Sequence, residues 1–183
     1  MRRLTHDDYW QDRLRRCILC DSGADLLSYG MGEKTMVRIA EELDAGKKVS
    51  DLKDLPQTVF LARKEDIPGG IVSDDIVLHS HEECLQNKKA EAENYRHIEE
   101  ESNKMHAQRL IQQVGNMYAV VNPPYPPMTT EELDASFDLP FTRLPHPKYK
   151  NKRIPAYEMI KHSVNLHRGC FGGCAFCTIS AHQ

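Results

Sequence analysis

Apolar residues recur at helical spacing in three stretches of the chain. The first covers residues 5–20, the second runs from a glycine turn at residues 30–33 to Gly46, and the third covers residues 82–114. We predict an amphipathic helix for each stretch. In the second helix we expect four apolar side chains to face inward: Met36, Ile39, Ala40 and Leu43.

Shorter apolar runs lie between these helices and predict strands. They cover residues 24–29, 58–62, 75–80 and 117–122. The strand, glycine turn and helix of residues 24–46 form half of a βαβ unit. We therefore expect an α/β fold, with a partial N-terminal α/β (Rossmann-like) domain over residues 1–121.

Proline dominates the part of the chain that follows. Eight of the ten prolines lie between residues 123 and 155, which excludes a regular helix or a central strand there. We expect a proline-rich connector over residues 122–157, with one short helix capped at Thr129. A helical turn is predicted for residues 156–161 and a strand for residues 162–168.

Charge is distributed unevenly along the chain. Residues 141–183 hold seven basic residues and one acidic residue, a net charge of +6, whereas residues 1–140 hold 17 basic and 26 acidic residues, a net charge of −9. The basic end suits either an anionic ligand or a solvated surface, and we favour the solvated surface. The overall charge of −3 argues against a general nucleic-acid binder.

Two absences in the sequence bear on location. The sequence contains no run of about 18 apolar residues, so we predict no transmembrane helix. Residues 1–8 lack the apolar stretch of a secretory signal. Six cysteines without such a signal indicate a reducing compartment, where thiols act as metal ligands or core residues. We expect a cytoplasmic protein with no membrane contact.

Three of the six cysteines stand close together near the end of the chain. Cys170, Cys174 and Cys177 have the spacing C-x3-C-x2-C, and glycines at positions 169, 172 and 173 permit a tight backbone path around a bound group. Thiolates are the usual ligands of iron–sulfur clusters. Three of them would leave one iron of a four-iron cluster without a protein ligand, which is an open position suited to chemistry.

At these residues the sequence resembles the radical S-adenosylmethionine (SAM) superfamily. Cys170, Cys174, Phe176 and Cys177 match its motif C-x3-C-x-aromatic-C. The resemblance implies a 4Fe–4S cluster on the three cysteines, with SAM bound to the open iron and Phe176 beside the adenine. It also implies reductive cleavage of SAM to a 5′-deoxyadenosyl radical, using an electron donor protein, in a (β/α) barrel.

A narrower resemblance covers nearly the whole chain. Residues 154–161, residues 165–174 and the motifs Asn122-Pro123-Pro124 and Leu139-Pro140-Phe141 look like the bacterial YgiQ-type radical SAM proteins. That family places an α/β domain before the barrel, which implies that residues 158–183 begin the barrel and hold the cluster loop. Because a barrel needs about 200 residues or more, we expect a fragment that lacks the remainder of the barrel and turns over little SAM alone. The substrate is not implied.

The main alternative is a non-catalytic binding module stabilised by zinc or by a cluster. Zinc would use the three cysteines together with His167 or His182, although zinc sites more often use paired C-x2-C motifs.

Three further patterns have both a chemical and a structural interpretation. Cys17 and Cys20 resemble a redox pair, but we favour core packing. His79, His81 and Cys84 resemble metal ligands, but we favour positions at a strand end and a helix start. The turn at Gly30 and Gly32 could present helix amides to a phosphate, but we favour a plain turn.

Overall fold

The computed structural model describes residues 2–164 together with Cys170, Gly172, Cys174 and Cys177. The chain divides into two compact units, the first extending to Pro127 and the second beginning at Met128. The domain limits expected at residues 121 and 157 stay predictions. In the described part no helix is long and apolar enough to cross a membrane.

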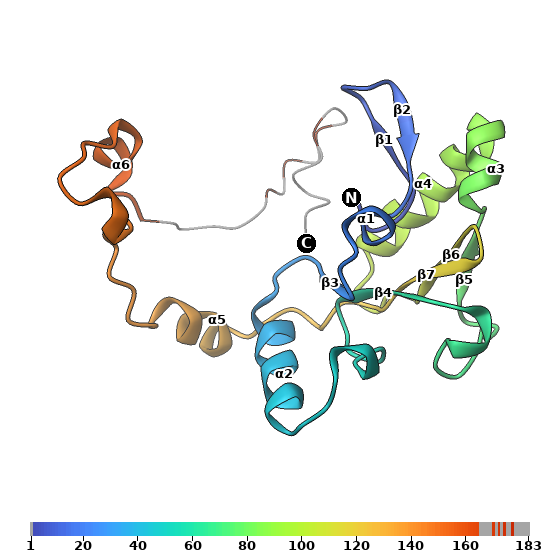
Figure 1. The fold of residues 1–183 in the computed structure, drawn as a ribbon, viewed down its shortest axis with the longest axis horizontal. Coiled ribbons are helices and arrows are strands. Elements are labelled where there is room, and N and C mark those ends of the chain that lie inside the picture. Colours follow the sequence, from blue (N-terminus) through green and yellow to red (C-terminus); the bar gives the residue numbers. More distant parts are fainter. Residues whose placement is uncertain (1, 165–169, 171, 173, 175–176, 178–183) are drawn as a thin grey trace. The chain divides into compact units, whose positions relative to one another are not determined.

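A five-stranded mixed sheet forms the centre of the first unit (Figure 1). Its spatial order is β3 (Leu26–Ser28), β4 (Thr58–Ala62), β7 (Met117–Val121), β6 (Leu110–Val114) and β5 (Ile76–Leu78). Only β5 and β6 are parallel, and the other neighbours are antiparallel. The strands predicted over residues 24–29, 58–62, 75–80 and 117–122 are therefore confirmed.

Apolar side chains on both faces of the sheet make the core. Val59, Ala119 and Val121 belong to a cluster with Leu4 and Leu19. On the opposite face, the register pairs Phe60 and Ile111 with Val120, and these three pack with Ile67 in a second cluster. Continuous apolar runs are typical of strands buried on both faces, which explains why β4 and β7 are evident in the sequence.

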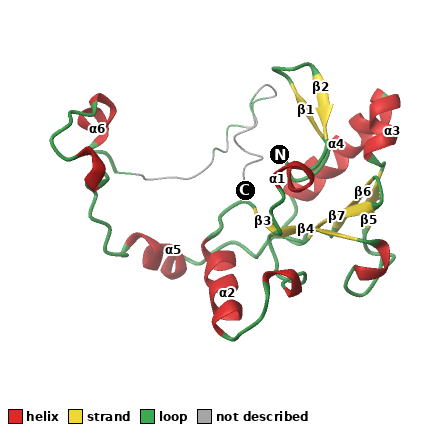
Figure 2. Cartoon of the chain, viewed as in Figure 1, coloured by secondary structure: helices red, strands yellow, loops and turns green. Residues whose placement is uncertain are grey.

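Four helices accompany the sheet (Figure 2). They are α1 (Ile18–Ser22), α2 (Glu33–Asp44), α3 (His81–Gln86) and α4 (Lys88–Ser102). Ser80 and Glu83 form a reciprocal capping box at the start of α3, and Asn87 caps α4. These caps occupy the backbone N–H groups that a helix start leaves without partners. Two short 3-10 turns, η1 (Val49–Asp51) and η2 (Lys64–Asp66), complete the connections.

The helix predicted over residues 5–20 is wrong. Residues His6–Asp8 (β1) and Arg13–Arg15 (β2) form a separate antiparallel hairpin, and only α1 is helical. Trp10 is 90% exposed at the hairpin tip, so the apolar helical face did not correspond to a buried surface. Asp12 adopts a positive φ of 48° in the turn, a conformation that Asp tolerates better than most residues and that ends any helix.

The single helix predicted over residues 82–114 is also wrong in its last part. Helix α4 ends at Ser102, and residues Leu110–Val114 form the strand β6 between β5 and β7. Gly115, with a φ of 59°, and Asn116 make a two-residue turn into β7. This Gly-Asn pair is a hairpin signal, which outweighs the helical spacing of Leu110, Ile111 and Val114.

The βαβ unit and the Rossmann-like organisation are not borne out by the strand directions. Strand β3 pairs with β4 antiparallel, so α2 joins antiparallel neighbours instead of parallel ones. The α/β class itself holds, because helices and a mixed sheet share one core. In α2, Met36, Ala40 and Leu43 were expected to face inward. Met36 and Leu43 are 57% and 41% exposed and Ala40 is exposed as well, whereas Thr35 is buried.

The second unit contains short helices in a proline-rich chain. They are α5 (Thr130–Phe137), the 3-10 turn η3 (Pro147–Tyr149) and α6 (Pro155–Ile160). The predicted cap at Thr129 is confirmed as a capping box with Glu132. The strand expected over residues 162–168 falls largely outside the described residues.

Candidate functional site

The described part of the cysteine loop presents three free thiols. Cys170 and Cys174 are exposed, and Cys177 is partly buried. The backbone N–H of Gly172 donates to Cys170 Sγ at 3.3 Å, and the N–H of Cys177 donates to the carbonyl of Cys174 at 3.0 Å. These two contacts join residues that are two and three positions apart.

Gly172 is the point where two of the sulfurs come together. A Cβ added there would lie 3.3 Å from Cys170 Sγ and 3.6 Å from Cys174 Sγ. Both sulfurs therefore approach the same short piece of backbone, on the side that a side chain would fill. Two exposed thiols beside a residue without a side chain are suited to act as cysteine ligands of an iron–sulfur cluster.

The rest of the expected site is only partly placed. Cys177 is described, but no three His, Cys, Asp or Glu side chains among the described residues are arranged to hold a metal ion. Phe176, His167 and His182 lie outside the described residues. The structure thus brings together two of the three expected ligands.

Cys17 and Cys20 are confirmed as core residues. Cys17 is fully buried and packs with Leu4 and Leu19. Burial raises the pKa of Cys17 to about 11 and also raises the pKa of Cys20. Because the thiolate is the reactive form, these two thiols are poorly suited to redox chemistry.

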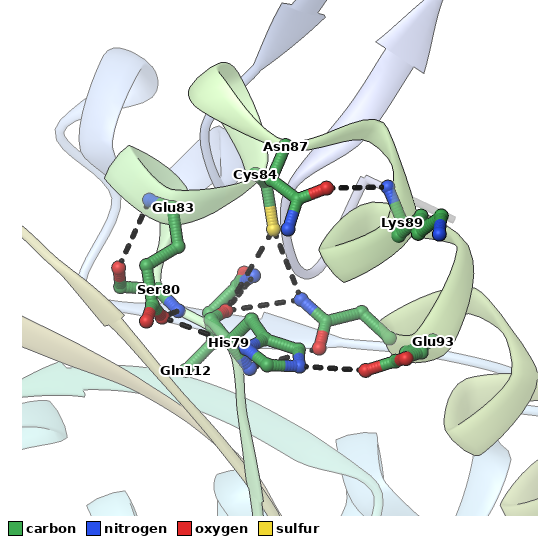
Figure 3. Close-up of polar contacts among 9 residues, drawn as sticks. His79, Ser80, Glu83, Cys84, Asn87, Lys89, Glu93 and Gln112 are labelled. Atoms are coloured by element: carbon green, nitrogen blue, oxygen red, sulfur yellow. Dashed lines mark hydrogen bonds and ion pairs between the residues drawn. The ribbon is translucent and has the colours of Figure 1, made fainter.

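The histidines next to Cys84 occupy the strand-end and helix-start positions that we favoured. His79 follows β5, and His81 is the first residue of α3. The His79 ring lies 2.9 Å from Glu93 and 3.7 Å from Glu83 (Figure 3). Cys84 is buried, and burial is the main cause that raises its pKa to about 12.

The sequence interpretation missed two buried amides, Asn94 and Gln112, that both contact the carbonyl of His79. Asn94 donates to Cys84 Sγ at 3.1 Å and to the His79 carbonyl at 3.0 Å. Gln112 donates to the same carbonyl at 3.0 Å, while its side-chain oxygen accepts from the N–H of Thr5 at 2.8 Å. The only signal in the sequence was that Asn94 in α4 and Gln112 in β6 are polar residues at positions where the pattern favours an apolar one. The network joins Thr5, the end of β5, α3, α4 and β6, and has a structural role.

The turn between β3 and α2 is held by a side chain from elsewhere in the first unit. The amide of Gln57 donates to the carbonyls of Tyr29, at 2.6 Å, and of Met31. Gly32 is the N-cap of α2 and offers no side-chain cap. The choice of a plain turn over a phosphate-binding turn stays a prediction.

The basic segment of the second unit is exposed. Lys161 pairs with Glu158 at 2.8 Å, and the Lys148 ammonium lies 4.9 Å from the centre of the Tyr149 ring. Both contacts join near neighbours on the surface, where such pairs add little stability. They agree with the solvated surface that we favoured.

Comparison with known proteins decides the family. Residues 1–163 match the family model described as Radical SAM N-terminal. The chain belongs to the radical SAM N-terminal family. The match includes residues 1–127 of the first unit and residues 128–163 of the second, and it ends before Cys170.

Relatives of this radical SAM N-terminal chain carry the name UPF0313. The whole chain aligns with the UPF0313 proteins of Bacteroides thetaiotaomicron, at 61% identity, and Porphyromonas gingivalis, at 59%. It also aligns over its full length with the UPF0313 protein YgiQ of Escherichia coli, at 37% identity. The chain spans 31%, 29% and 32% of these three relatives. No solved structure matches it.

Proposed function

We propose that this chain provides the cluster loop of a radical SAM enzyme, in which Cys170, Cys174 and Cys177 bind a 4Fe–4S cluster. The observation that carries the proposal is the C-x3-C-x2-C spacing around Gly172, whose missing side chain lets two sulfurs lie close to one backbone segment. Membership of the radical SAM N-terminal family supports it.

The bound cluster would supply the electron that cleaves SAM reductively, and its iron without a cysteine ligand would coordinate the SAM amino and carboxylate groups. SAM and a reductant protein are therefore the proposed partners. Phe176 would provide an apolar wall for the adenine ring. We propose no nucleic-acid or membrane partner, and a cytoplasmic location follows from the need for reduced thiols.

The chain's own residues would act first by orienting a sulfur. The Gly172 N–H donates to Cys170 Sγ at 3.3 Å. Bonds of this kind around a metal site orient its ligands and tune its potential. The exposure of Cys170 and Cys174 leaves room for both a cluster and a second ligand.

The test is the electron paramagnetic resonance spectrum of the reduced, anaerobically reconstituted protein with and without SAM. We would record it for this chain and for the B. thetaiotaomicron relative, which is 61% identical. The expected result is a change in the spectrum on adding SAM. A control with both Cys17→Ala and Cys20→Ala should behave like the unchanged chain.

Two results would count against the proposal. An identical spectrum in the longer relative at saturating SAM would exclude coordination to the open iron. Purification with one zinc per chain and no iron would instead favour the non-catalytic binding module.

A further inference from the structure

A cavity of about 280 Å³ lies beside β3, the edge strand of the sheet. It is lined by Ala24, Asp25, Leu26, Val49, Ser50, Leu52, Lys53, Phe60 and Leu61. These residues come from β3, from β4 and from the turn η1 with the residues that follow it. Its volume is just below the range of about 300–1,000 Å³ that is typical of pockets for drug-sized ligands, so it suits a smaller molecule.

The apolar part of the lining is well fixed. Phe60 and Leu52 are 2% and 1% exposed, and Phe60 belongs to the core cluster on that face of the sheet. The carbonyl of Lys53 accepts a hydrogen bond of 2.9 Å from the buried Asn122 side chain. This part of the lining therefore exists before any ligand binds, which reduces the ordering cost of binding.

Two residues of opposite charge, Asp25 and Lys53, also line the cavity. Asp25 precedes β3, and Lys53 follows η1. Among the described residues neither forms an ion pair, with the other or with a third group. A ligand that carries an ammonium and a carboxylate could satisfy both charges at once, while its side chain contacts Leu26, which is only partly buried.

We propose that this cavity binds a small free α-amino acid with an aliphatic side chain. The ammonium of the ligand pairs with Asp25, the carboxylate pairs with Lys53, and the side chain lies against Leu26. The site belongs to the first unit and does not depend on the cysteine loop. The family membership assigns no ligand to it.

The test compares L-leucine with two analogues that each lack one charge. Isoamylamine lacks the carboxylate, and 4-methylpentanoate lacks the ammonium. Binding to the full chain is measured by ligand-observed nuclear magnetic resonance titration, without any cluster. Each missing charge removes a charge-assisted contact, so the affinity of both analogues should be at least about tenfold weaker than that of leucine.

Charge-removing variants locate the two contacts. In Lys53→Gln, leucine and isoamylamine should bind equally, because the partner of the carboxylate is gone. In Asp25→Asn, leucine and 4-methylpentanoate should bind equally. The exposed neighbours Lys48 and Asp54 provide matched controls, Lys48→Gln and Asp54→Asn, which should keep the preference for leucine.

Two outcomes would overturn the proposal. One is the absence of saturable leucine binding to the unchanged chain. The other is an unaltered preference for leucine in both Lys53→Gln and Asp25→Asn. Neither result depends on iron or SAM, so failure here is distinct from failure of the proposed radical SAM function.

Discussion

Asn94 holds the backbone of His79 through two hydrogen bonds. Its side-chain oxygen accepts from the His79 N–H at 2.8 Å, and its side-chain nitrogen donates to the His79 carbonyl at 3.0 Å. Asn94 lies in α4 and is only 2% exposed. The end of β5 is therefore tied to a helix fifteen residues further along the chain.

Replacing Asn94 with Ala should destabilise the protein by about 2 kcal/mol, because the partly buried N–H and carbonyl of His79 both lose a partner. The matched control is Asn87→Ala, which removes only the exposed cap of α4 and should cost about 1 kcal/mol. Urea denaturation of both variants measures the difference. The interpretation is wrong if Asn94→Ala costs no more than Asn87→Ala.

The ion pair between Asp75 and Arg109 should make stability depend on pH. Arg109 donates to the two Asp75 carboxylate oxygens at 2.8 and 2.7 Å, and the Asp75 side chain is 4% exposed. Burial raises the pKa of Asp75, but hydrogen bonds from Arg109 and from the Val72 N–H lower it overall. The carboxylate is thus favoured in the folded state.

A carboxyl whose pKa is lowered on folding stabilises the protein at pH values above the pKa that it has in the unfolded chain, about 3.9 for Asp. This stabilisation is lost as the pH falls below that value. Asp75→Asn should therefore cost about 2 kcal/mol at pH 7, and its deficit should shrink below about pH 4. Urea midpoints at pH 7, 5 and 3.5 test this. The exposed Asp74→Asn control should show no deficit, and an equal deficit for Asp75→Asn at all three pH values would contradict the account.

The thiols should differ sharply in reactivity. Cys170 and Cys174 are exposed, whereas Cys17 and Cys84 are buried and have pKa values raised to about 11 and 12. At pH 7.5 only about one in three thousand Cys17 thiols would be ionised. Mass spectrometry after brief iodoacetamide treatment should find Cys170 and Cys174 labelled and the buried pair unlabelled. Labelling of Cys17 or Cys84 at the rate of Cys170 would contradict this.

Adding a methyl group at Gly172 should weaken iron binding. A Cβ there would meet Cys170 Sγ at 3.3 Å and Cys174 Sγ at 3.6 Å, and ligand sets tolerate displacements of only about 0.5 Å. Gly172→Ala should therefore retain about half or less of the iron after anaerobic reconstitution. The control Gly32→Ala adds a methyl 3.4 Å from Ser28 Oγ, far from the loop in sequence, and should retain full iron. Equal iron in both variants would argue against the role of Gly172.

The features that were predicted from sequence depend on local information. Strand β4 is a continuous apolar run, and the Thr129 cap needs only Glu132 three residues away. These patterns determine structure within a few residues. The spacing of the three cysteines is likewise local, and their role as ligands stays a prediction.

The features that were missed depend on partners distant in the sequence. Leu110 has helical spacing with its neighbours, but it is a strand residue because it pairs with both Ile76 and Val121. Gln112 contacts Thr5, which is 107 residues away. Residues 5–20 matched a helix by spacing alone, while the hairpin is favoured by cross-strand pairs such as Asp8 with Arg15.

The most direct test of the central claim is the iron and acid-labile sulfide content per chain after anaerobic reconstitution. We predict about four of each for the unchanged chain, with loss of the cluster in Cys170→Ala, Cys174→Ala and Cys177→Ala and its retention in Cys17→Ala. One zinc in place of the iron, or a complete cluster in Cys174→Ala, would contradict the assignment of these three cysteines as the ligands.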